Sequence, residues 1–122
     1  MKKSIAFALA LVVGEGGASA QSVGSLAPGQ VMTGNASAFS DGVWLRVSGQ
    51  VGHANCFYAP GNSSLFYAKP NGAVDPKKAL AILMTAKLSG RTVDLQYDSN
   101  GVQTDFYGYG ISQCEIVRLV LN

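Results

Sequence analysis

One helical segment divides an otherwise extended chain, and this pattern limits the folds available to it. Asp75-Pro76 opens the segment, because an Asp side chain can cap free backbone N–H groups and Pro is tolerated at the first helical position. Gly90 ends it, since glycine is common just after the last turn of a helix. The residues between them are more apolar than a helix with one solvent-facing side requires. The sequence therefore predicts a single, largely apolar helix.

Extended segments are predicted on both sides of this helix. Apolar and polar side chains alternate most clearly over residues 92–98, which is the period of a half-buried β-strand. Turn residues such as Pro60-Gly61-Asn62 separate the segments. Three strands, one helix and two strands is the element order of an OB-fold, a mainly β, five-stranded Greek-key barrel with its helix between strands three and four. Other α+β arrangements share this order. The five predicted strands are 43–48, 56–58, 65–68, 92–98 and 111–121.

The first twenty residues have the organisation of a Sec-type signal peptide. Two lysines precede an uninterrupted apolar run over residues 5–13, which is too short to cross a bilayer. Ala18-Ser19-Ala20 is the small-x-small pattern that signal peptidase accepts, so cleavage is predicted after Ala20. A buried N-terminal helix is the alternative, but three closely spaced glycines would break it.

Removal of this segment would leave a secreted or periplasmic protein. No later segment is long and apolar enough to be expected to insert into a membrane. We expect residues 1–20 to be the signal peptide, 21–40 to form an irregular N-terminal arm rich in Gly, Ser and Ala, and 41–122 to form one OB-fold binding domain.

Cys56 and Cys114 are the only cysteines and lie 58 positions apart. An oxidising compartment favours a disulfide between them, and closing so long a loop stabilises a fold by about 4 kcal/mol in the chain-entropy model. The alternative is a Cys–His nucleophile formed by Cys56 and His53, the only histidine. A metal site is not expected, because one histidine and two distant thiols cannot complete a tetrahedral ligand set. The sequence predicts a structural disulfide between the second and last strands.

Composition and motifs argue against several classes of function. Charged residues make up 13% of the chain and the net charge is +2, so nucleic acid is not an expected partner. No Gly-rich phosphate loop and no Gly-x-Ser-x-Gly elbow is present. Asp94 and Asp98 share one face of a predicted strand, but about 13 Å separates them along the chain, which excludes direct pairing. We expect no catalytic residues and no cofactor, and a small hydrolase is the weakest hypothesis.

Aromatic residues supply a candidate binding loop. Residues 105–110 read Asp-Phe-Tyr-Gly-Tyr-Gly and join the last two predicted strands, where barrel loops often carry binding. A tyrosine offers a flat apolar face and a hydroxyl group, which suits a sugar ring or a protein partner. Tyr107 and Tyr109 are therefore candidate binding residues. The alternative is that these rings cover one end of the barrel.

The stretch 79–98 resembles part of a known toxin family. Its helix ends in Leu88-Ser89-Gly90-Arg91 and runs into Thr-Val-Asp-Leu-Gln-Tyr-Asp, as in the binding (B) subunits of AB5 toxins of the subtilase-cytotoxin and typhoid-toxin type, which are pertussis-like. Cys56-Phe57-Tyr58 resembles the second strand of these subunits, and the resemblance extends over residues 41–120. It implies an OB-fold, a ring of five copies with helices lining its centre, and an outer face that binds sialylated glycans.

The resemblance also implies two site residues. Tyr97 falls on a family tyrosine that contacts the glycan, and Asp41 falls near a family serine or aspartate that contacts the sialic acid. The chain departs from the family in placing Cys114 in its last strand. The leading hypothesis is a secreted, non-catalytic glycan-binding subunit of a bacterial AB5-type toxin, a homopentamer that attaches to host-cell glycans and delivers a separate toxic A subunit. The alternative is a periplasmic or envelope-associated OB-like binding or inhibitor protein with no toxin partner.

Overall fold

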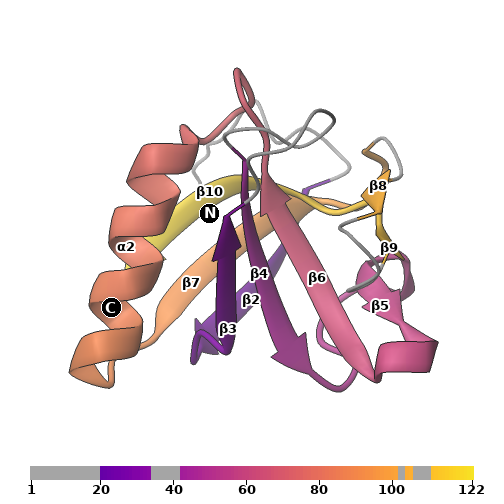
Figure 1. Ribbon diagram of the computed structural model, residues 1–122, viewed down its shortest axis with the longest axis horizontal. Coiled ribbons are helices and arrows are strands. Elements are labelled where there is room, and N and C mark those ends of the chain that lie inside the picture. The colour runs from indigo at the N-terminus through magenta and orange to yellow at the C-terminus, as the bar shows by residue number, and fades with distance from the viewer. Residues whose placement is uncertain (1–19, 34–41, 102–103, 106–110) are drawn as a thin grey trace, which may run out of the picture.

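The computed structural model describes residues 20–33, 42–101, 104–105 and 111–122. The fold is mainly β. One helix packs against a mixed seven-stranded sheet, and β8 and β9 form a separate two-stranded sheet (Figure 1). The elements are β2 (Ala20–Leu26), β3 (Gln30–Thr33), β4 (Val43–Ser48), η2 (Ala54–Cys56), β5 (Phe57–Tyr58), η3 (Ala59–Gly61), β6 (Ser63–Ala68), α2 (Pro76–Ser89), β7 (Val93–Asp98), β8 (Thr104–Asp105), β9 (Ile111–Ser112) and β10 (Glu115–Leu121).

The large sheet is open. Its strand order is β2-β7-β10-β6-β4-β3, and β5 pairs with β6 off this path. Every ladder is antiparallel except that of β10 and β6, which run parallel and meet at Glu115 and Tyr67. The two end strands, β2 and β3, are joined in sequence by residues 27–29 alone. The sheet therefore curls so that its ends approach each other at this connection, but no described ladder closes it into the expected barrel.

The N-terminal residues differ from the expected irregular arm. Gln21 lies opposite Tyr97 in the β2–β7 ladder, and Met32 lies opposite Trp44 in the β3–β4 ladder. β2 consists largely of small and polar residues, and all seven of its residues are half-buried or exposed. An edge strand of this kind is held mainly by backbone hydrogen bonds to its neighbour. Its sequence therefore needs little alternation of apolar and polar residues, which is the pattern that predicts a strand. Residues 34–41 lie outside the described residues.

The predicted helix is confirmed, together with its end signals. The Asp75 carboxylate accepts a hydrogen bond from the backbone N–H of Lys78 at 3.2 Å. Gly90 takes the left-handed conformation at φ 69°, and its N–H bonds to the carbonyl of Ala86. The predicted strand at 92–98 is confirmed as β7. The predicted strand at 111–121 is divided into β9 and β10, with Cys114 between them.

The main core lies between the sheet and α2. Ala79, Leu83 and Ala86 of the helix pack against the inward side chains of β4, β6 and β7, and all three are fully buried. A second cluster lies on the opposite face of β3, β4 and β6, because residues next to each other in a strand point to opposite faces. It contains Met32, Trp44, Leu65 and Tyr67.

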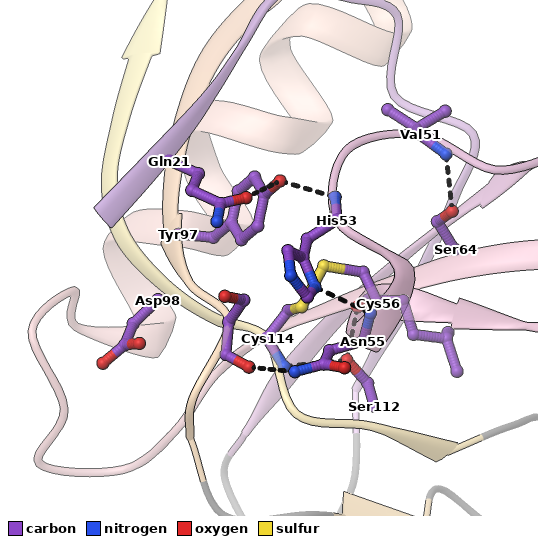
Figure 2. Close-up of a disulfide and its surroundings, with 12 residues drawn as sticks. Gln21, Val51, His53, Asn55, Cys56, Ser64, Tyr97, Asp98, Ser112 and Cys114 are labelled. Atoms are coloured by element: carbon purple, nitrogen blue, oxygen red, sulfur yellow. Dashed lines mark hydrogen bonds between the residues drawn. A yellow bond between two sulfur atoms is a disulfide. The ribbon is translucent and has the colours of Figure 1, made fainter. Parts of the chain in front are cut away.

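The predicted disulfide is confirmed. Cys56 and Cys114 are bonded, with a Cα–Cα distance of 5.4 Å, and both residues are fully buried (Figure 2). Cys56 ends η2 directly before β5, and Cys114 directly precedes β10, so the bond joins the residues that lead into these two observed strands. No helix in the described part of the chain has the length and hydropathy needed to cross a membrane.

Candidate functional site

Of the four residues predicted to contact a glycan, the structure describes one. Asp41, Tyr107 and Tyr109 lie outside the described residues. Tyr97 lies in the core and is 1% exposed. In this arrangement its ring offers no surface to a ligand, and we leave it out of the candidate site.

Tyr97 instead joins three segments of the fold. Its hydroxyl donates a hydrogen bond to Oε1 of Gln21 at 2.9 Å and accepts one from the backbone N–H of His53 at 2.7 Å (Figure 2). Its ring packs edge-on against Phe66, with 5.1 Å between the ring centroids. Strand β2, strand β7 and the turn that ends at His53 therefore meet at one hydroxyl group. This arrangement indicates a structural role for Tyr97.

His53 also acts within the fold. Its Nδ1 accepts the backbone N–H of Asn55 at 3.0 Å and so caps η2, next to the disulfide (Figure 2). The side-chain amide of Asn55 in turn donates to the carbonyl of Ser99 at 2.8 Å. The sulfur of Cys56 is bonded to Cys114, so the alternative of a Cys–His nucleophile is wrong.

A polar hollow lies on the outer face of β2, β7 and β10, and we take it as the candidate site. Val93, Leu95 and Tyr97 of β7 are buried, so the residues between them point outward. The register then sets Ser22 of β2 and Arg118 of β10 opposite Gln96, and Val120 opposite Asp94. The hollow has a volume of about 270 Å³, and its lining includes Ser22, Gly24, Asp94, Gln96, Arg118 and Val120.

Small residues of β2 leave the space open. Gly24 has no side chain, and a Cβ atom there would lie 3.7 Å from Oδ1 of Asp94, which is ordinary van der Waals contact. The β2–β7 register shifts between Val23 and Leu26, where Ser25 adopts a φ of 51°. The irregular turn directs the N–H of Ser25 toward Asp94 at 2.9 Å. β2 therefore contributes both the space and one hydrogen bond that holds the carboxylate.

Asp94 is the fixed acceptor of the hollow. Its Oδ1 accepts hydrogen bonds from the side-chain amide of Asn122 at 3.0 Å and from Ser25 N–H at 2.9 Å. The Asn122 bond, then the Ser25 bond and the nearby Arg118 guanidinium, hold the pKa of Asp94 below its usual value. The carboxylate is therefore charged at neutral pH. Its second oxygen, Oδ2, has no hydrogen-bond partner among the described residues and can accept one from a ligand.

The other polar side chains of the hollow are available to a ligand. No hydrogen bond or ion pair links the side chains of Ser22, Gln96 and Arg118 to any residue that the structure describes. Together they offer a hydroxyl, an amide that both donates and accepts, and a guanidinium with five N–H donors. Val120, 38% exposed, adds an apolar patch at the same place. This set can hold a neutral or weakly charged ligand rich in hydroxyl groups.

The sequence did not predict that the polar side chains of the hollow lie together. The polar side chains that alternate with apolar ones over residues 92–98 could have indicated that Asp94 and Gln96 lie on an outer face. Arg118 could have been noticed as a charged residue within an apolar strand. Nothing in the sequence of β2 links Ser22 to them, because that link depends on register.

Comparison with protein-family models, with curated proteins and with solved structures finds no match to this chain. Among the described residues, no three His, Cys, Asp or Glu side chains gather as metal ligands would.

Proposed function

We propose that the protein is an exported, non-catalytic glycan-binding protein that holds its ligand in the polar hollow. The observation that carries this proposal is the unbonded set of Ser22, Gln96 and Arg118 around the oriented carboxylate of Asp94. Sugar hydroxyls both donate and accept hydrogen bonds, so they can pair with each of these groups. The aliphatic face of a sugar ring can cover the exposed part of Val120.

We further propose that the fold is an interrupted OB-fold. If β2 and β3 are counted as one broken first strand, then β4, β6, β7 and β10 become strands two to five. The strand order is then 1-4-5-3-2-1, with a parallel contact between strands three and five and the helix between strands three and four. The proposal keeps the predicted element order but takes the first strand from residues 20–33, and it makes 43–48 the second strand.

The toxin-type assembly, a homopentamer with a separate toxic A subunit that attaches to host glycans, is proposed as the setting of this site. The outward face of α2 supports it. Leu88 is 80% exposed, and Thr85 and Ala81 are exposed one and two turns before it, respectively, on the same side of the helix. Contact with the helices of other copies would cover this face. Light scattering of the purified protein tests the assembly, and a monomeric mass would contradict it.

A glycan array probed with the purified, exported protein tests the binding function. We expect binding to at least one glycan, and Arg118→Ala should weaken it about tenfold or more, because a hydrogen bond from a charged group contributes about 1.5–3 kcal/mol. Gly24→Leu should also weaken binding, because its side chain would occupy the hollow without backbone strain. Lys77→Ala is the matched control, since this exposed lysine lies outside the hollow.

The array also separates the two hypotheses of function. Binding that none of the hollow variants alters would contradict the proposed site. If no glycan binds and the protein copurifies with an envelope protein, then the alternative of an envelope-associated binding or inhibitor protein is favoured.

A further inference from the structure

A second hollow adjoins the polar hollow at Arg118. It lies between β10 and the N-terminal half of α2 and has a volume of about 520 Å³. Arg118 belongs to the lining of both hollows. The rest of its lining includes Asn71, Val74, Lys78, Ile82 and Leu119.

The second hollow exists because β10 leaves β6 after a short contact. The two strands meet at Glu115 and Tyr67, and past that point β7 is the one described strand that pairs with β10. The loop before α2 is fastened across the gap, because Glu115 accepts the N–H of Ala73 at 3.2 Å and forms an ion pair with Lys69 at 3.6 Å. The hollow is thus bounded by a fixed loop, a helix and a strand edge.

The chemistry of the second hollow differs from that of the first. Val74, Ile82 and Leu119 are half-buried and give it an apolar wall. The Asp75 carboxylate is engaged in capping α2 through the Lys78 N–H. The Lys78 ammonium makes no ion pair with a described residue, so it is available above that wall.

We propose that the ligand is an oligosaccharide that extends from the polar hollow across Arg118 into the second hollow, an inference that rests on the proposed function. The polar hollow alone, at about 270 Å³, is smaller than the 300–1,000 Å³ usual for ligand pockets, whereas the two hollows together fall within that range. One sugar residue occupies the polar hollow, and the following residues contact the apolar wall and Lys78. Arg118 contacts both parts, because a guanidinium presents N–H donors on several sides.

Affinity should therefore depend on ligand length. The probe is an array of glycans of one to six sugar residues, followed by calorimetric titration of the strongest binder and of the mono- and disaccharides cut from each of its ends. We expect the full oligosaccharide to bind roughly tenfold or more tightly than its best short fragment. Lys78→Ala should remove most of this gain and leave fragment binding unchanged, whereas Arg118→Ala should weaken both. Lys77→Ala, at the neighbouring exposed lysine, is the control.

The outcomes separate the inference from the proposed function. Equal affinity for fragment and full oligosaccharide, or a full-length affinity that Lys78→Ala leaves unchanged, would overturn the inference while the glycan-binding function stands. Absence of binding to every glycan would overturn both. In NMR titrations, the backbone amides of Val74 and Ile82, which line the second hollow alone, should shift with the full ligand and stay unchanged with the fragment that fills the polar hollow. If the fragment shifts these amides and the full ligand does not, the oligosaccharide does not extend into the second hollow.

Discussion

Replacing Tyr97 with Phe removes one hydroxyl group from the point where three segments meet, and it should lower the free energy of unfolding by about 2 kcal/mol. The hydroxyl takes part in two hydrogen bonds, to Gln21 at 2.9 Å and from His53 at 2.7 Å. Each contributes about 1 kcal/mol net to stability. The net value applies because both partners are only partly buried, so water can reach them when the hydroxyl is gone. The ring and its contact with Phe66 remain in place.

Urea unfolding measures this loss through the fluorescence of Trp44, the only tryptophan and 1% exposed. With a slope of about 1–3 kcal/mol per molar urea for a small protein, the midpoint of Tyr97→Phe should fall by roughly 1 M. Tyr58→Phe is the matched control. This tyrosine is half-buried, and its hydroxyl has no hydrogen bond to the described residues, so the change should stay within about 0.5 kcal/mol. If the two variants unfold at the same urea concentration, then Tyr97 does not join the segments as argued.

Two further predictions concern local geometry. Gly52→Ala should lower the melting temperature more than Gly49→Ala. Both glycines have a φ near +76°, but only at position 52 would a Cβ collide with the Tyr97 hydroxyl. Equal decreases in melting temperature would rule out that contact. Asn122→Ala should raise the pKa of Asp94 in a carboxyl NMR titration, since it removes the main cause of the lowered value. A lowered carboxyl pKa stabilises the fold at pH values above the unfolded-state pKa, and this stabilisation is lost as pH falls through the folded-state pKa. The variant has less of this stabilisation to lose, so acid should destabilise it less than the wild type. An unchanged titration of Asp94 would argue against the hydrogen bond from Asn122.

Local signals predicted the parts of the fold that local interactions form. Asp75 and Gly90 mark the ends of α2 because capping involves only neighbouring residues. The alternation that predicted β7 also sets Tyr97 on the same side as Val93 and Leu95, which are buried. That period indicates burial of Tyr97, and it conflicts with the glycan contact that the family resemblance implied.

The parts that sequence did not predict depend on distant pairing. β2 has no hydrophobic alternation of its own, and its place in the sheet comes from a strand about 70 positions later in the chain. The polar hollow needs the registers of β2, β7 and β10 together, because only these bring Ser22, Gln96 and Arg118 into one row. Neither composition nor spacing along a single segment contains that information.

The pairing of early segments with late ones also sets the order in which the fold can form. A chain that emerges from its N-terminus presents β2 long before β7, and Cys56 must wait for Cys114, 58 positions later, before it can be oxidised correctly. β10, which connects β7 to β6, follows Cys114. Contacts of such long sequence separation form slowly and late. A chain that ends before β7 and β10 would therefore hold little tertiary structure, because β2 and Cys56 would both lack their partners.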